Sequence, residues 1–299
     1  MKLLLLLSLF TLTGCFSRYQ MTDREIRQHY AQREALGFCT KPTFHTIEND
    51  TAKLFVATTG ADTLPPLLLI HGAPGAWYGY IRMADDTALQ RRFQILSVER
   101  PGYGHSRKRG QRSIREIDQQ AGRIALALSL NRSGKPAIVL GRSYGSPVAL
   151  RLATMLPEKV GHLVLISSAI DPDKEKFWWF SKLGRSPLIR WALPRPLNTA
   201  TDEKYAHVAE LKKLLPRWST LQTPVTVLQG GTDWIVDTTN FSFAKRMLVG
   251  KRAEFVFLPQ SGHLITSSNP DLIRSLVLQK ADSLAGKQQP SVLGSTSSN

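Results

Sequence analysis

The stretch GRSYG, residues 141–145, places a serine between two glycines where an apolar segment ends. Residues 137–140 are predicted to form a buried strand, and a helix is predicted to begin directly after the stretch. A serine on such a sharp strand-to-helix turn projects its hydroxyl above the edge of the sheet. Side chains at Gly141 and Gly145 would collide with the neighbouring strand and helix. The pattern therefore predicts that Ser143 is a nucleophile for acyl transfer; the alternative is an ordinary tight turn.

A serine hydroxyl is a weak nucleophile unless a base removes its proton. His263 directly follows the last predicted strand, and Asp233 directly follows the strand before it. Both residues should lie at the carboxyl-end edge of the sheet, beside Ser143, in the chain order serine, acid, histidine. We expect His263 to act as the base and Asp233 to orient it. Asp237 is a second candidate carboxylate, but its position beside the next helix favours a capping role.

Acyl transfer also requires hydrogen-bond donors for the oxyanion. One expected donor is the backbone N–H of Tyr144, the residue after the serine. The second should come from the sequence HGAPG, which follows an apolar strand at residues 66–70. Pro74 has no N–H, so Ala73 is the expected donor in this loop. His71 is expected to shape the loop by hydrogen bonding.

The remaining histidines lack a comparable context. His162 begins a predicted strand and should point to the opposite end of the sheet, while His45, His105 and His207 are expected at the surface. The histidines and the two cysteines do not follow the spacing of metal ligands. We therefore predict neither a metal nor a cofactor.

The elements that must position these residues alternate between apolar strands and helical patterns. The predicted strands are 53–57, 66–70, 94–98, 137–140, 162–166, 225–228 and 254–258. The predicted helices are 113–129, opened by a capping box from Ser113 to Glu116, then 146–156, 238–248 and 270–284. An additional helix is predicted between a capping box at Thr22 and a stop at Gly37. Several strands are continuous apolar runs, which favours an α/β fold with a mostly parallel sheet and helices on both faces.

The alternation breaks at residues 171–223. This segment contains the aromatic run 177–180 and a helical pattern at 202–215. An insertion after the carboxyl end of a strand should cover the site as a small helical lid. Its aromatic residues either contact an apolar substrate or pack the lid onto the body. The predicted core is 40–170 and 224–287, and residues 288–299 are predicted to be a disordered tail.

Taken together, these stretches resemble the α/β-hydrolase superfamily over residues 50–285. The stretches are HGAPG, ERPGYGHS at residues 99–106, GRSYG, GGTD and SGH. The resemblance implies a serine–histidine–aspartate hydrolase in which Glu99 and Arg100 belong to a structural turn. Epoxide hydrolases and dehalogenases have an aspartate where this chain has Ser143. Proline iminopeptidases usually have a glycine at the position of Ala73, so the resemblance favours an esterase.

The N-terminus carries a separate signal. Residues 1–14 are predicted to be a signal peptide, with a short apolar stretch from Leu3 to Leu12. The sequence LTGC ending at Cys15 resembles the bacterial lipoprotein box, which implies cleavage before Cys15 and lipidation of its thiol. Residues 15–39 would then be a lipidated tether and helix, and Cys39 would have no disulfide partner. The alternatives are an ordinary signal peptide and an uncleaved anchor.

The chain is strongly basic, with a formal net charge of +16. This charge indicates either a solvated basic surface or attraction to anionic surfaces such as a membrane. The basic residues are dispersed and no nucleic-acid-binding motif is present, which argues against nucleic acid as a partner.

Together, the motifs and the N-terminal signal predict a serine esterase of the bacterial cell envelope that acts on a small-molecule ester. The alternatives are an aminopeptidase or amidase with the same residues, and a non-catalytic binding lipoprotein.

Overall fold

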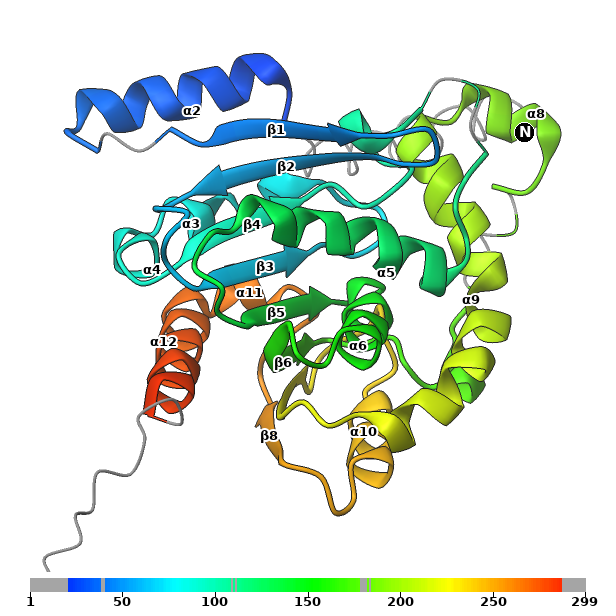
Figure 1. The fold of residues 1–299 in the computed structure, drawn as a ribbon. Coiled ribbons are helices and arrows are strands. Elements are labelled where there is room, and N and C mark those ends of the chain that lie inside the picture. Colours follow the sequence, from blue (N-terminus) through cyan, green and yellow to red (C-terminus); the bar gives the residue numbers. More distant parts are fainter. Residues whose placement is uncertain are drawn as a thin grey trace, which may run out of the picture.

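The computed structural model describes residues 21–38, 41–108, 110, 112–177, 182 and 184–286. The centre of the described structure is an eight-stranded sheet in the order β1-β2-β4-β3-β5-β6-β7-β8 (Figure 1). The strands are β1 (Thr43–Glu48), β2 (Lys53–Thr59), β3 (Pro66–Ile70), β4 (Gln94–Val98), β5 (Ala137–Arg142), β6 (Val160–Ile166), β7 (Val225–Gly230) and β8 (Ala253–Leu258). β2 is antiparallel to both of its neighbours, and all other pairs are parallel. The predicted α/β fold with a mostly parallel sheet is confirmed.

The helices cover both faces of this sheet (Figure 1). The α-helices in the described part of the chain are α2 (Asp23–Ala35), α3 (Ile81–Ala84), α4 (Thr87–Gln90), α5 (Ile117–Ala125), α6 (Gly145–Met155), α8 (Pro187–Ala192), α9 (Arg195–Thr220), α10 (Asn240–Met247), α11 (Ile265–Ser268) and α12 (Pro270–Gly286). Short 3₁₀ helices are η1 (Trp77–Tyr80), η2 (Gly104–Ser106), η3 (Leu126–Leu130) and η4 (Pro172–Lys174). None of the helices in the described part of the chain combines the length and the apolar composition needed to cross a membrane.

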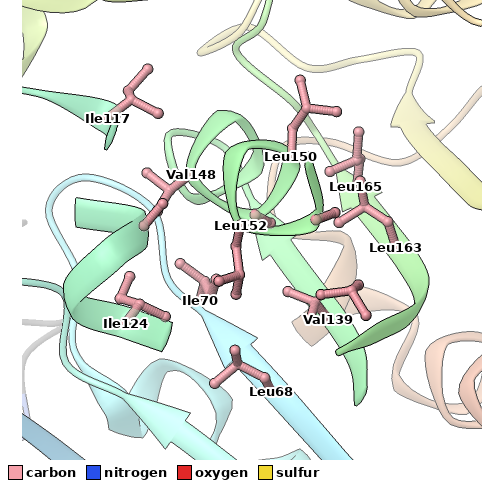
Figure 2. Close-up of a cluster of buried hydrophobic side chains, with 14 of the residues drawn as sticks. Leu68, Ile70, Ile117, Ile124, Val139, Val148, Leu150, Leu152, Leu163 and Leu165 are labelled. Atoms are coloured by element: carbon pink, nitrogen blue, oxygen red, sulfur yellow. The ribbon is translucent and has the colours of Figure 1, made fainter. Parts of the chain in front are cut away.

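The two faces of the sheet bury different side chains of the same strands. Leu68 and Ile70 of β3 lie in a cluster with apolar residues of α5 and α6 (Figure 2). The same cluster also contains apolar residues of α9. Leu67 and Leu69 lie in a second cluster with residues of α3, α4, α11 and α12. Because successive side chains of a strand point to opposite faces, a strand covered on both sides must be apolar throughout. This requirement explains the continuous apolar runs in the sequence.

Two local predictions have different outcomes. The capping box at Thr22 is confirmed: its hydroxyl accepts from the Glu25 N–H, and the Glu25 carboxylate accepts from the Thr22 N–H at 2.7 Å. The capping box at Ser113 is wrong, since α5 begins only at Ile117. The Ser113 hydroxyl instead donates to the Asp202 carboxylate, and the Ile117 N–H donates to the Glu210 carboxylate. Both carboxylates belong to α9, so a distant segment fixes the start of this helix.

The sequence between β6 and β7 forms η4, α8 and α9. Figure 1 shows α9 on the side of the molecule toward which β3 and β5 point. Leu211, Leu214 and Trp218 of α9 are buried in the first core cluster. The predicted helix at 202–215 lies within α9, which is longer at both ends. Cys15, Cys39, most of the aromatic run 177–180, the signal segment and the tail lie outside the described residues.

Candidate active site

Ser143 occupies a strained backbone conformation at the turn between β5 and α6. Its φ angle is +54°, in the left-handed region that residues other than glycine rarely adopt. The Ser143 N–H donates to the carbonyl of Ile166 at 2.9 Å, and the Ser146 N–H donates to the Ser143 carbonyl at 3.0 Å. Such conformations persist only where the surroundings hold them, and they cluster at functional sites. The Ser143 side chain is half-buried at the carboxyl-end edge of the sheet.

The glycines on either side of Ser143 are required by close backbone contacts. A Cβ atom at Gly141 would lie 2.6 Å from the carbonyl oxygen of Gly145. One at Gly145 would lie 2.4 Å from the carbonyl oxygen of Ile70 at the end of β3. Both distances are shorter than real Cβ contacts, so the collision predicted from the sequence is confirmed. The turn is therefore compressed between its own helix α6 and the neighbouring strand β3.

Asp233 and His263 are joined by a short hydrogen bond. His263 Nδ1 lies 2.8 Å from Asp233 Oδ2, and a carboxylate can only accept, so the imidazole N–H donates. Asp233 Oδ1 accepts from the backbone N–H groups of Ile235 and Val236, each at 3.0 Å. Burial alone would raise the pKa of the Asp233 carboxyl, but His263 and these two N–H groups hold it below its usual range. Asp233 is thus a buried carboxylate that fixes one imidazole nitrogen.

Asp237, the other candidate carboxylate, has different partners. Its Oδ1 atom accepts from the N–H and the hydroxyl of Thr239, and Oδ2 lies 3.5 Å from the Lys176 ammonium. These contacts lie just before α10, where a capping role was predicted. Of the two carboxylates, Asp233 is the one that meets His263.

The Ser143 turn and the His263 segment are linked through their neighbours. Arg142, the residue before the serine, donates to the Thr266 hydroxyl at 3.1 Å, three residues after His263. Within the described part of the chain, no hydrogen bond joins the Ser143 hydroxyl to His263. The structure therefore brings Asp233 and His263 together, and it ties the Ser143 turn to the segment that carries the histidine.

Ala73 and Tyr144, the expected oxyanion donors, line one hollow together with Ser143. In the described residues, no hydrogen-bond partner is present for the backbone N–H of either residue. The two chain segments are in close contact, since a Cβ atom at Gly72 would lie 3.0 Å from the Ser143 Cβ atom. Two free N–H donors beside a serine can stabilise a negative oxygen in the hollow.

His71 holds the loop that carries Ala73. The Arg100 N–H donates to His71 Nε2 at 2.9 Å, while the proton on Nδ1 is donated to the Gly72 carbonyl at 2.7 Å. With one nitrogen accepting and the other donating, the ring is neutral. Burial, aided by the Arg100 charge, keeps the His71 pKa well below its usual value. The contacts are those expected of a histidine that shapes its loop.

Arg100 connects this loop to α9. Its guanidinium donates to the carbonyls of His71 and Gly72, at 2.8 and 3.1 Å. It also donates to both carboxylate oxygens of Glu203, at 2.6 and 3.0 Å, and both side chains are fully buried. The Tyr103 hydroxyl donates to the same carboxylate at 2.6 Å. The sequence did not single out Glu203, because a lone glutamate on a helix usually indicates a solvated surface.

The hollow beside Ser143 contains several charged side chains. Besides Ser143, Ala73 and Tyr144, its lining includes Lys174, Glu175, Lys176, Lys204, His207 and Asp237. Glu175 forms an ion pair with Lys204 and accepts a hydrogen bond from His207 Nδ1 at 2.9 Å. Although burial opposes it, these partners lower the pKa of Glu175 to about 2.

The predicted surface position of His207 is wrong. Only 2% of its side chain is exposed, and its ring packs on that of Tyr144 with the centroids 4.5 Å apart. Packing of α9 over the Ser143 turn buries this histidine, a tertiary effect that its local sequence does not contain. Its Nε2 atom is buried and has no partner among the described residues.

Comparisons with known proteins bear on the family and the fold of the chain. A model of the alpha/beta hydrolase family matches residues 67–276. A pimeloyl-[acyl-carrier protein] methyl ester esterase of Nitrosomonas europaea is 35% identical over 39% of this chain and 42% of its own length. One from Aliivibrio fischeri is 29% identical over 50% of this chain and 52% of its own length. The chain thus spans about half the length of these curated relatives.

A solved structure supports the fold over a longer range. The crystal structure of a membrane phospholipase A, described as a bacterial virulence factor, superposes with a TM-score of 0.66. The superposition covers 95% of this chain and 99% of that protein, at 22% sequence identity. At this identity the likeness concerns the fold.

Proposed function

Because the chain belongs to the alpha/beta hydrolase family, we propose that it is a serine hydrolase that cleaves a carboxylic ester through an acyl-enzyme. In this proposal His263 removes the proton from Ser143, and the serine oxygen attacks the ester carbonyl. Asp233 keeps the His263 Nδ1 proton in place, so that Nε2 is the nitrogen available as base. The observation that carries the proposal is the Asp233–His263 hydrogen bond, on the sheet edge where Ser143 sits in a strained turn.

The oxyanion of the tetrahedral intermediate is assigned to the N–H groups of Ala73 and Tyr144. Each such donor contributes roughly 3–4 kcal/mol to transition-state stabilisation in comparable enzymes. His263 then protonates the departing alcohol and activates the water that hydrolyses the acyl-enzyme. The match to two methyl ester esterases favours an ester as substrate.

We propose that residues 171–223 act as the lid of this site. The support is that Lys204 and His207 of α9 line the hollow together with Ser143. A lid with this polar face would select the substrate by charge and hydrogen bonding as well as by shape.

The assignment is tested by Ser143→Ala with p-nitrophenyl butyrate as substrate. We expect turnover to fall by at least a thousandfold without loss of the folded state. A fluorophosphonate probe should label the unaltered protein and not the variant. Unchanged turnover in the variant would overturn the assignment of Ser143 as the nucleophile. If the unaltered protein cleaved aminoacyl amides in preference to esters, the proposed activity would be that of an amidase and not of an esterase.

For location, we propose that Cys15 is lipidated and attaches the enzyme to the bacterial cell envelope. Two acyl chains anchor a protein far more firmly than one. Labelled palmitate should enter the unaltered chain but not Cys15→Ser. Equal labelling of both, together with unchanged membrane association of the variant, would contradict this proposal.

A further inference from the structure

A second hollow, here named the arginine groove, lies beside the N-terminal part of α9. Its charged lining consists of five arginines and one carboxylate: Arg107, Arg112, Arg115, Arg190, Arg195 and Asp202. Thr199 and Asp202 border this groove, while Ala200 and Lys204 of the same helix border the hollow with Ser143. The two hollows are therefore separated by one helix.

The positive charge of the arginine groove is largely uncompensated. Asp202 accepts both guanidinium hydrogen bonds of Arg190, at 2.8 and 3.0 Å, and the hydroxyl of Ser113. Within the described part of the chain, none of the other four arginines has a carboxylate at ion-pair distance. Since guanidinium groups bind phosphates well, the groove is suited to phosphate-bearing ligands.

Two large apolar side chains are exposed next to these arginines. They belong to α8, a short helix in which no residue is buried. Leu188 is 85% exposed and Trp191 is 88% exposed, more than any other large apolar residue described. Arg190 lies between them in sequence and lines the groove. Figure 1 shows α8 at the periphery, by the N-terminal end of α9.

We propose that the arginine groove and α8 form a docking site for the surface of an anionic phospholipid bilayer. The arginines bind lipid phosphates, while Trp191 and Leu188 enter the headgroup region. Tryptophan is favoured at membrane interfaces, and cationic side chains are attracted to anionic lipids. A soluble polyanion would account for the arginines but would leave the two apolar side chains in water. Docking here would hold the hollow with Ser143 close to the lipid surface.

The docking site is tested by vesicle binding of the full chain. The probes are vesicles of phosphatidylcholine alone and with 30% phosphatidylglycerol, measured by co-sedimentation in about 0.1 M salt. The test variant is Arg112→Gln/Arg195→Gln, and the control is Arg24→Gln/Arg27→Gln on α2, which removes the same charge. All four side chains are exposed. The apolar N-terminal residues contribute equally to all of these proteins and cancel in the comparison.

We expect phosphatidylglycerol to strengthen binding of the unaltered chain and of the α2 control. The groove variant should lose roughly ten- to thirtyfold of the affinity for the anionic vesicles, since each arginine near such a surface contributes about fivefold. An equal loss in both double variants would mean that only net charge matters and would overturn the proposal. So would groove-dependent binding to heparin without any response to phosphatidylglycerol, because it would assign the groove to a soluble polyanion.

Insertion of α8 is tested separately by fluorescence. Brominated phosphatidylglycerol should quench part of the tryptophan emission of the vesicle-bound chain, and Trp191→Phe should remove most of that quenched part. The same component should disappear in the Arg112→Gln/Arg195→Gln background. Quenching that is unchanged by Trp191→Phe would contradict the contact between α8 and lipid.

Discussion

The imidazole of His263 donates a 2.8 Å hydrogen bond to the carboxylate of Asp233, whose other oxygen accepts two backbone N–H groups. Asp233→Asn keeps the shape of this contact but can place an amide N–H against the imidazole. The imidazole would then adopt the tautomer that presents a proton, instead of a lone pair, to Ser143. We expect kcat for p-nitrophenyl butyrate to fall by about 10⁴.

Asp237→Asn is the matched control for this prediction. Asp237 contacts Thr239 and Lys176 and makes no hydrogen bond to His263, so kcat should change by less than about threefold. A larger loss of kcat in Asp237→Asn than in Asp233→Asn would show that Asp237, and not Asp233, is the carboxylate that orients His263. Circular dichroism melts of both variants report whether a loss reflects unfolding.

The buried Arg100–Glu203 pair yields a prediction about stability. Glu203→Gln leaves the fully buried guanidinium with no carboxylate, and removing one partner of such a pair costs about 3–5 kcal/mol in the free energy of unfolding. Because Arg100 also binds the His71 and Gly72 carbonyls, kcat should fall through displacement of the Ala73 N–H. Urea unfolding and ester turnover measure the two effects.

The control is Asp118→Asn at the exposed end of the Arg151–Asp118 pair. An exposed ion pair contributes only about 0–1 kcal/mol, so this variant should unfold almost like the unaltered protein. Equal losses in the free energy of unfolding for Asp118→Asn and Glu203→Gln would show that the buried pair contributes no more to stability than the exposed one.

Much of this fold could be predicted because the relevant information is local. β3 and β4 have the predicted bounds, since a strand buried on both faces is an uninterrupted apolar run. Asp233 and His263 were identified by their positions after strands, and in a parallel sheet those positions converge. The Ser143 turn was predictable because only glycine fits on either side of it.

The remaining features depend on contacts between distant segments. β1 was not predicted because it is an edge strand whose residues are mostly exposed, so no apolar run marks it. The start of α5 is fixed by Glu210 of α9, and His207 is buried by the packing of α9 on Tyr144. Glu203 gains its role only when α9 places it against Arg100.

The low pKa of Glu175 predicts a pH-dependent contribution to stability. Despite its burial, the hydrogen bond from His207 and the Lys204 ammonium lower its pKa to about 2 from an ordinary value of 4.5. The folded state therefore favours the charged form, and the stabilisation is complete above about pH 5 and is lost as the pH falls toward 2. A depression of this size corresponds to roughly 3 kcal/mol.

Glu175→Gln tests this dependence in urea unfolding at pH 7, 5, 4 and 3. The variant should be less stable at pH 7, and its difference from the unaltered protein should shrink as the pH falls below 5. A difference that stays constant from pH 7 to 3 would rule out a contribution from the Glu175 charge.

The lysines around the hollow predict a preference for esters that carry a negative charge. Lys204 and Lys176 are paired with Glu175 and Asp237, whereas Lys174 has no carboxylate partner among the described residues. Monomethyl glutarate and methyl pentanoate differ mainly in the terminal carboxylate, so the ratio of their kcat/KM values measures this preference. Lys174→Glu should lower the ratio roughly five- to thirtyfold, because it changes the charge by two units and each charge at an exposed position acts with about 0.5–1 kcal/mol. Lys212→Glu, an exposed change on α9 outside the lining, should leave the ratio unchanged. If both variants lower the ratio equally, the preference comes from overall charge and not from Lys174 at the hollow.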